Sequence, residues 1–278
     1  MIKKLHPSQK GEIHPTACIS PQAQLGERVY VGPFCVVGPD VVLEEDVTLV
    51  SHICLEGRTT IGARTKIYPF ASIGFPPQDL KYRGEPSELH IGTDNVIREY
   101  VTMQPGTEGG GMVTTIGNHG LFMASVHVAH DCHVGDHVIM ANNATLSGHV
   151  TIGDYAIIGG LAAVHQFVRV GAHAMIGGMS GIERDLIPYG TAIGERASLT
   201  GLNIVGLKRR GYTREEIQNL QAAYAQIFTI PSETLEARVK KVRASFPQIP
   251  CLQELLNFLE APAQRSFCLP KGYPIPES

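Results

Sequence analysis

Histidines are concentrated in one stretch of the chain, where eight of the 12 lie between His119 and His173. Within that stretch His130 is followed directly by Asp131. Imidazole is the side chain best suited to accept and return a proton near neutral pH, and an adjacent carboxylate can fix which ring nitrogen carries the proton. The pair is therefore typical of a site that moves a proton.

A six-residue repeat must position these side chains. Apolar residues recur at every sixth place from Ile13 to Ile73, from Ile91 to Met103 and from Ile116 to Ile182. All 26 repeat positions are apolar, although hydrophobic residues make up only 43% of the chain. A period of six fits neither a helix nor an alternating strand, but it fits a short strand and a tight turn repeated around a closed coil. We therefore predict an all-β parallel β-helix in which three hexads form one coil.

Two gaps interrupt the repeat. They cover residues 74–90 and 104–115, and we expect both to be loop insertions that leave the wall of the solenoid. Loops on a rigid scaffold often carry function, so both are candidates for substrate contact.

A change of period ends the repeat beyond Pro188. Apolar residues at helical spacing then predict three helices, and a capping-box pattern from Thr213 to Glu216 marks the start of the first. The predicted organisation is a β-helix domain over residues 1–190, followed by a small α-helical C-terminal domain over residues 191–278.

The repeat also predicts which residues lie side by side, because residues eighteen apart should stack about 4.8 Å from one another in adjacent coils. A glycine in such a column lets an acyl group approach the backbone N–H closely, as oxyanion stabilisation requires. One corner then gathers imidazoles, a carboxylate, an amide and a bare glycine backbone, and we take it as the candidate active site. Its columns place His130 under Gly148 and Gln166, Asp131 under His149, and Ser147 under His165, with His127 one side-chain reach away.

A separate column contains four rings, His119, His137, Tyr155 and His173. Each follows an inward apolar residue by three places. We interpret this column as a stacked surface ladder that shields the wall and lies outside the site.

A zinc site is an alternative interpretation of the histidines. His127, His130 and His149 offer three nitrogen ligands, and their spacing does not exclude this role. The adjacent Asp131, the glycine column and the long helical segment have no purpose in a zinc site. We therefore expect no bound metal.

Composition excludes several classes of protein. A formal charge of -3 with 43% hydrophobic residues excludes a disordered chain and argues against a protein that coats nucleic acid. The longest run of apolar residues and glycine, 156–164, is far shorter than the roughly 20 residues of a membrane span, and the start of the chain resembles no export signal. The six cysteines form no CxxC pair, so we expect reduced thiols and a cytoplasmic location.

Several motifs resemble one enzyme family. They are QDLKYRGEP at 78–86, HVAHDC at 127–132, SGH at 147–149, VHQF at 164–167 and NIVGLKRRG at 203–211. In this order they resemble the UDP-N-acetylglucosamine O-acyltransferases, within the hexapeptide-repeat acyltransferases. The resemblance implies a left-handed β-helix and transfer of an (R)-3-hydroxyacyl chain to the 3-hydroxyl of UDP-N-acetylglucosamine, the opening step of lipid A biosynthesis. It also implies a donor carried on the phosphopantetheine of acyl carrier protein, no permanently bound cofactor and a homotrimer.

The resemblance also implies roles for individual residues. His130 is the general base, Asp131 orients its ring, and the Gly148 backbone N–H faces the oxyanion. Paired guanidinium groups suit a diphosphate because of their planar fork. The implied substrate-binding residues are Gln78, Asp79, Lys81, His127, His149, His165, Gln166, Asn203, Arg209 and Arg210.

Gly178 matches the position that sets the acyl-chain length in that family, and Met179 and Arg196 complete the candidate ruler. Arg196 stands where a histidine is frequent in the family, and Val205 stands where an acidic residue is frequent near the nucleotide. The alternatives are an N-acyltransferase of UDP-amino sugars, a zinc-dependent enzyme of the same superfamily and a non-catalytic solenoid scaffold.

Overall fold

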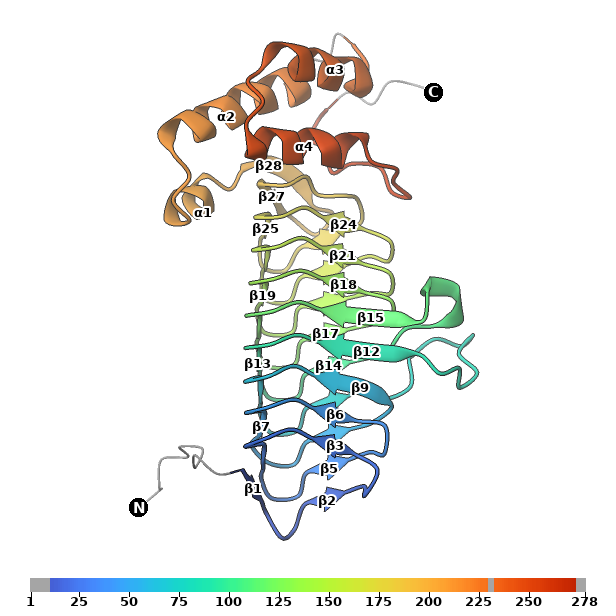
Figure 1. Ribbon diagram of the computed structural model, residues 1–278. Coiled ribbons are helices and arrows are strands. Elements are labelled where there is room, and N and C mark those ends of the chain that lie inside the picture. Colours follow the sequence, from blue (N-terminus) through green and yellow to red (C-terminus); the bar gives the residue numbers. More distant parts are fainter. Residues whose placement is uncertain (1–10, 230–232, 274–278) are drawn as a thin grey trace.

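A parallel β-helix forms most of the computed structural model, which describes residues 11–229 and 233–273 (Figure 1). Its strands stack into three sheets, which make the three faces of a prism. The first sheet contains β1 (Glu12–Ile13), β4 (Tyr30–Val31), β7 (Thr48–Leu49), β10 (Lys66–Ile67), β13 (Val96–Ile97), β16 (Leu121–Phe122), β19 (Ile139–Met140), β22 (Ile157–Ile158), β25 (Met175–Ile176), β27 (Gly190–Ile193) and β28 (Ser198–Leu202).

The second and third sheets are built in the same way. The second contains β2 (Cys18–Ile19), β5 (Val36–Val37), β8 (Cys54–Leu55), β11 (Ser72–Ile73), β14 (Thr102–Met103), β17 (His127–Val128), β20 (Thr145–Leu146), β23 (Ala163–Val164) and β26 (Gly181–Ile182). The third contains β3 (Gln24–Leu25), β6 (Val42–Leu43), β9 (Arg58–Ile61), β12 (Glu88–Ile91), β15 (Val113–Ile116), β18 (His133–Val134), β21 (Thr151–Ile152) and β24 (Arg169–Val170).

The core is a stack of the repeat's apolar residues. Val128 pairs with Leu146 and Leu146 with Val164, so the eighteen-residue register holds here, and all three side chains are buried. The register lengthens where a loop is inserted, because Ile67 pairs with Ile97. Each coil thus adds a layer to one continuous aliphatic core.

The corners turn through residues in the left-handed backbone region. In the predicted ring column, φ is 56° at His119, 56° at His137, 59° at Tyr155 and 59° at His173. This conformation costs roughly 1–2 kcal/mol for a residue with a Cβ atom. The rings stack with centroids 4.8, 4.5 and 4.9 Å apart, which offsets part of that cost, and Tyr189 extends the column. The predicted ladder is present.

Both insertions leave the same corner, between the second and third sheets. The first covers residues 74–87 because β12 begins at Glu88, and the second covers residues 104–112 because β15 begins at Val113. The expected ends, 90 and 115, lie three residues too far along the chain. The reason is that β12 and β15 are four residues long and start before the hexad pattern resumes. A short 3₁₀ turn, η1 (Glu108–Gly110), lies in the second insertion.

The helical part covers the end of the solenoid, where Figure 1 shows the helices packed above the last strands. It comprises α1 (Ile204–Arg209), α2 (Arg214–Phe228), α3 (Leu235–Ser245) and α4 (Pro250–Glu260). The capping box at Thr213 and Glu216 is present, as predicted. No helix of residues 11–229 and 233–273 is long and apolar enough to cross a membrane.

The strands of the first sheet continue past residue 190, where the sequence predicts the domain boundary. A domain change at residue 190 places β27 and β28 in the helical part, but these strands pair with each other and extend the first sheet through β25. Because β27 and β28 form an antiparallel hairpin, they lack the hexad spacing by which the parallel strands were recognised. The helices begin at Ile204, and α1 itself was not predicted.

Candidate active site

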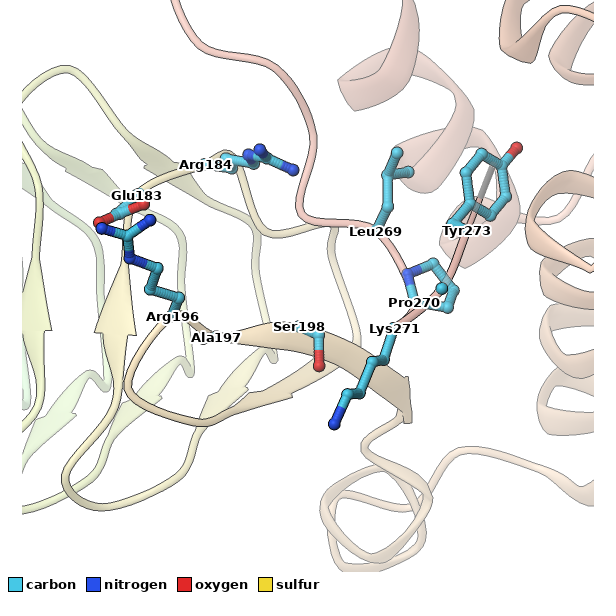
Figure 2. Close-up of a pocket in the computed structure, with 10 residues that line it drawn as sticks. Glu183, Arg184, Arg196, Ala197, Ser198, Leu269, Pro270, Lys271 and Tyr273 are labelled. Atoms are coloured by element: carbon cyan, nitrogen blue, oxygen red, sulfur yellow. The ribbon is translucent and has the colours of Figure 1, made fainter. Parts of the chain in front are cut away.

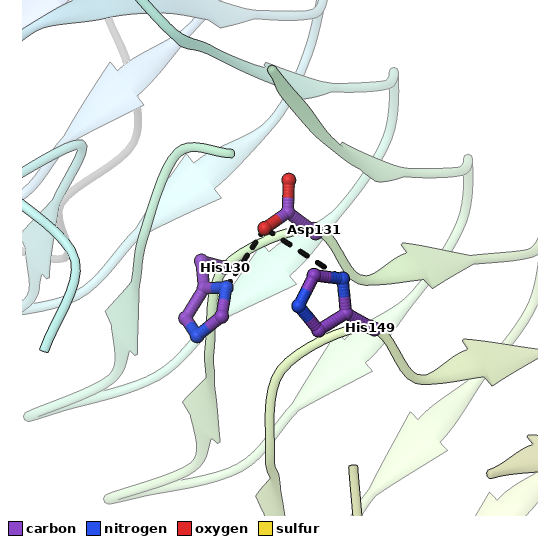
Figure 3. A group of neighbouring side chains, drawn as sticks. All are labelled: His130, Asp131 and His149. Carbon is purple, nitrogen blue, oxygen red and sulfur yellow. Dashed lines mark hydrogen bonds and ion pairs between the residues drawn. The ribbon is translucent and has the colours of Figure 1, made fainter. Parts of the chain in front are cut away.

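His130 and Asp131 lie in the turn between β17 and β18 (Figure 3). The Nδ1 atom of His130 lies 2.8 Å from Oδ2 of Asp131. Asp131 has a φ of 58°, and its backbone N–H donates to Oγ1 of Thr114 at 2.8 Å. The left-handed turn and this hydrogen bond hold the carboxylate beside the ring.

Asp131 is a buried, fully engaged carboxylate, with no exposed side-chain surface. Its Oδ1 accepts the backbone N–H of Thr107 at 2.8 Å, and its Oδ2 accepts the Thr107 hydroxyl at 2.6 Å. Burial by itself raises the pKa of the Asp131 carboxyl, but hydrogen bonds from His130 and Thr107 outweigh burial and hold the pKa below its usual range. The group therefore stays ionised at neutral pH.

Gly148 lies against the His130 ring. A Cβ atom added at Gly148 would lie 2.6 Å from Nε2 of His130, which is closer than real Cβ contacts come. The column that puts His130 under Gly148 is therefore reproduced. Only glycine leaves room for the ring at this place.

His149 approaches from the next coil. Its Nδ1 lies 3.8 Å from Oδ2 of Asp131, and its ring meets the His130 ring edge-on at 5.0 Å. Burial lowers the pKa of His149, while the charge of Asp131 opposes this shift. The charges of Asp79 and Lys81 also act on this ring, so the first insertion reaches the corner.

His127 lies on β17, three residues before His130. Its Nδ1 lies 2.7 Å from Oγ1 of Thr102. Burial lowers the pKa of His127, and the charge of the neighbouring His130 lowers it further. The ring is therefore neutral at neutral pH and can offer one donor and one acceptor to a ligand.

Gln78, Asp79 and Lys81 are held in the first insertion. The backbone N–H of Gln78 donates to Oε1 of Gln104 at 3.2 Å, which ties this insertion to the start of the second. Oδ1 of Asp79 accepts the backbone N–H of Lys81 at 2.9 Å. The insertion is thus an ordered loop beside the corner.

His165 and Gln166 lie at the upper end of the same corner, after β23. Arg265, from the segment that follows α4, contacts both: its Nη2 lies 3.0 Å from Nδ1 of His165, and its Nε donates to the Gln166 carbonyl at 3.1 Å. Sequence reasoning missed Arg265 and Thr107. Neither belongs to a hexad column, and each reaches the corner from a distant segment.

Asn203, Arg209 and Arg210 lie elsewhere. They line a cavity of about 560 Å³ whose other walls include Ile157 and Met175 of the first sheet. A triangular coil places the first sheet opposite the corner between the second and third sheets. Within one chain, the structure therefore does not bring these residues to His130.

The three residues of this cavity differ in how free they are. Asn203 caps α1 by accepting the Gly206 N–H at 3.0 Å. Arg210 donates to the Tyr155 carbonyl at 2.8 Å and lies over the Tyr155 ring. Arg209 is exposed, which makes it the guanidinium most available to a ligand.

The candidate ruler residues lie at the end of the second sheet. Gly178 and Met179 precede β26, and Met179 is 73% exposed. The loop with Arg196 crosses over β26, because the Ala197 N–H donates to the Gly181 carbonyl at 2.9 Å. Arg196 also lines a cavity of about 280 Å³ with Arg184 and Lys271 (Figure 2).

A metal ion is one further possibility at the corner. His130, Asp131 and His149 offer ligand atoms that all lie within 4.8 Å of one another. His127, which the alternative zinc interpretation included, is not among them. A metal between these atoms would replace the hydrogen bond from His130 to Asp131, so the two arrangements exclude each other.

Known proteins resemble this chain throughout. Residues 185–268 match the family model described as "Udp N-acetylglucosamine O-acyltransferase; Domain 2". Curated relatives named acyl-[acyl-carrier-protein]--UDP-N-acetylglucosamine O-acyltransferase include one from Thermodesulfovibrio yellowstonii, 50% identical over 92% of this chain and 99% of its own. Another, from Caulobacter vibrioides, is 53% identical over 93% of this chain and 98% of its own.

Solved structures agree with these relatives. LpxA from Acinetobacter baumannii superimposes with a TM-score of 0.89 and 41% identity, covering 92% of this chain and 98% of its own. A UDP-N-acetylglucosamine acyltransferase superimposes with a TM-score of 0.90 and 44% identity, covering 94% and 100%. Such structures are left-handed parallel β-helices, and the predicted fold is confirmed.

Proposed function

The chain belongs to the UDP-N-acetylglucosamine O-acyltransferases, and from this premise we propose how its own residues carry out the transfer. It moves an (R)-3-hydroxyacyl chain from acyl carrier protein to the 3-hydroxyl of UDP-N-acetylglucosamine, opening lipid A biosynthesis in the cytoplasm. The observation that carries the mechanism is the hydrogen bond between His130 and the buried Asp131 carboxylate.

This hydrogen bond assigns the proton on the His130 ring. An ionised carboxylate only accepts, so Nδ1 of His130 must carry the hydrogen. The Nε2 atom then has a free lone pair, and it makes no hydrogen bond within the described residues. His130 is therefore set up to take a proton from the sugar hydroxyl through Nε2.

The reaction follows from that assignment. As Nε2 takes the proton, the sugar oxygen bonds to the thioester carbonyl carbon, and the carbonyl oxygen becomes an oxyanion. The backbone N–H of Gly148, the residue that lies against the His130 ring, stabilises this oxyanion. The carbon–sulfur bond then breaks, the thiolate of the phosphopantetheine leaves, and the imidazolium returns its proton to the sulfur. Asp131 stabilises the imidazolium while it exists.

Neutral imidazoles surround the base. Burial keeps His127 and His149 uncharged, so they act as hydrogen-bonding groups for the bound substrates and do not compete for the transferred proton. Gln78, Asp79 and Lys81 of the first insertion contact the substrates from the side. The exposed Arg209 binds the diphosphate.

We propose a homotrimer, which the placement of the two clusters supports. The corner with His130 lies between the second and third sheets, whereas the cavity with Arg209 lies against the first sheet, so one chain does not bring the two clusters together. In a ring of three copies, the cavity of one chain faces the corner of the next, and each site is shared. Sedimentation that finds a fully active monomer would overturn this arrangement.

Replacement of His130 tests the mechanism. We expect His130→Ala to lower kcat on the order of 10² to 10⁴, the usual contribution of a general base, with little change in KM. His133→Ala is the matched control, since His133 is exposed on the adjacent β18. Product is measured by mass spectrometry with UDP-N-acetylglucosamine and hydroxyacyl carrier protein.

Two outcomes would contradict the proposal. A His130→Ala variant that keeps more than about a tenth of wild-type turnover would assign the base elsewhere, with His127 the next residue to test. Activity that is lost on chelation and restored by zinc would show that His130, Asp131 and His149 hold a metal instead.

A further inference from the structure

A guanidinium group from the C-terminal segment lies against a histidine of the active-site corner. The Arg265 side chain reaches across 100 residues of sequence to Nδ1 of His165, 3.0 Å away. The same side chain donates through Nε to the backbone carbonyl of Gln166 at 3.1 Å. One planar group thus makes two contacts with consecutive residues of the solenoid.

The backbone around Arg265 is fixed to the solenoid. The Asp185 N–H donates to the Ser266 carbonyl at 2.9 Å, and the Cys268 N–H donates to the Asp185 carbonyl at 2.7 Å. Asp185 is itself buried, and its carboxylate accepts from Arg169 at 2.7 Å. The backbone next to Arg265 is therefore held against the solenoid, and the two contacts with His165 and Gln166 place the guanidinium.

The chemistry of the contact determines where His165 carries its proton. Guanidinium has five N–H donors, no acceptor, and stays protonated. Nδ1 of His165 must therefore accept from Arg265, which leaves the proton of the neutral ring on Nε2. The Gln166 carbonyl also lies 3.2 Å from Nδ1, but an Nδ1–H donated to it would leave the Nη2–H of Arg265 facing a second donor.

Without Arg265 the same ring has the opposite preference. The Gln166 carbonyl loses its donor and becomes an acceptor for an Nδ1–H of His165. The proton then moves to Nδ1, and Nε2 becomes an acceptor. The donor and acceptor roles of the exposed nitrogen are exchanged without any change in the position of the ring.

We propose that Arg265 is a positioning residue that holds His165 as the Nε2–H tautomer, so that the ring donates a hydrogen bond to an oxygen of the bound substrate. This proposal rests on the proposed function only for the identity of the substrate. The tautomer is a property of the free protein. The role of Arg265 is comparable to that of the group that hydrogen-bonds to a metal-bound histidine and fixes the tautomer and orientation of its ring.

Nuclear magnetic resonance tests the tautomer directly. Two-bond proton–nitrogen spectra of protein labelled with ¹⁵N-histidine distinguish protonated from unprotonated ring nitrogens, and His165→Gln identifies the signal by its loss. We expect Nδ1 of His165 to be unprotonated in the wild type and in Arg265→Lys, which keeps a donor. In Arg265→Gln we expect the Nδ1–H form to appear. Arg214→Gln, an exposed arginine on α2, is the matched control.

Kinetics then tests the use of the tautomer. Arg265→Gln should raise the KM of one substrate, UDP-N-acetylglucosamine or hydroxyacyl carrier protein, by about tenfold, while kcat stays within about threefold. Arg265→Lys should restore most of the loss. The double variant with His165→Gln should lose no more than the larger single loss, because the two residues act as a unit.

The failures are distinct from a failure of the proposed function. A wild-type ring with its proton on Nδ1, or the same tautomer in Arg265→Gln, would overturn the positioning role. A tautomer that changes as expected while both KM values stay constant would overturn the hydrogen bond to substrate. Either result leaves the test of His130 untouched, since that test measures turnover at a different ring.

Discussion

Replacing Asp131 by asparagine changes the hydrogen bonds of the site and almost none of its shape. The two carboxylate oxygens accept three donors, the Thr107 N–H on Oδ1 and both the Thr107 hydroxyl and His130 Nδ1 on Oδ2. An amide keeps one oxygen and turns the other into a donor. With its oxygen on the Thr107 N–H, its NH₂ faces the Thr107 hydroxyl and Nδ1 of His130, which both can accept.

In that orientation the proton of His130 lies on Nε2. This nitrogen can then no longer accept the proton of the sugar hydroxyl, so the general base is lost. The reverse orientation keeps Nδ1–H but sets the amide NH₂ against the Thr107 N–H, which leaves a buried donor unpaired at about 1–3 kcal/mol, or about 5–150-fold. Loss of the charge-assisted bond to the imidazolium adds about another tenfold. We expect Asp131→Asn to lower kcat by on the order of 10² to 10³, with KM little changed.

Steady-state kinetics with the same two substrates measures this effect. Thr107→Val is the matched control, because it removes one bond to Oδ2 but leaves the proton on Nδ1 of His130, and we expect a loss below about tenfold. A kcat of Asp131→Asn within about fivefold of the wild-type kcat would refute the reasoning. It would show that the ring finds its proton arrangement without the carboxylate.

Asp131→Asn should also change how the free energy of unfolding depends on pH. The pKa of Asp131 is lower in the folded protein than its unfolded value of about 3.9. Its contribution to folding is therefore present above about pH 4 and is lost as the pH falls through the folded value. Urea unfolding should show that wild type and Asp131→Asn converge below about pH 4, whereas an unchanging difference would contradict the assignment.

Three further predictions use residues away from the base. Gly178→Met should shorten the preferred acyl chain without abolishing turnover, and an unchanged product profile in competition between donors would show that another side chain limits the chain. Arg209→Ala should mainly raise the KM for UDP-N-acetylglucosamine, whereas Arg210→Ala should mainly lower the melting temperature, because Arg210 is bound to the Tyr155 carbonyl and ring. Burial lowers the pKa of His173 to about 4, so folding stability should fall between pH 6.5 and about 4 as the unfolded chain takes up the proton first. In His173→Phe, the urea midpoint of unfolding should change less with pH in that window, measured at fixed protein concentration.

The hexad period predicted which residues stack in neighbouring coils wherever no insertion separates the coils. Counting by eighteen placed His130 under Gly148 because no residue is inserted between them, and it predicted the ring ladder for the same reason. It fails across the insertions, where the partner of Ile67 is Ile97, thirty residues on, and that of Ile97 is Phe122. A repeat carries no information about the length of a loop that leaves it.

Counting by eighteen residues could not predict the contacts that the irregular segments make. Thr107 reaches Asp131 from a loop, and Arg265 reaches His165 from beyond the last helix. Both depend on where a chain returns to the wall, which is decided by packing of the whole molecule. The hairpin of β27 and β28 was missed because an antiparallel pair needs no eighteen-residue repeat.

These two irregular contacts give two histidines of one corner opposite roles. At His130 the buried carboxylate accepts from Nδ1, so the ring's other nitrogen is an acceptor and takes a proton. At His165 the guanidinium donates to Nδ1, so the other nitrogen is a donor and holds an oxygen. The two rings lie in neighbouring columns of the wall, since His130 shares its column with Gly148 and His165 shares its column with Ser147. At His130 the charge comes from Asp131 of the solenoid turn, which the loop residue Thr107 holds through two hydrogen bonds. At His165 the charge of opposite sign comes from Arg265 of the C-terminal segment.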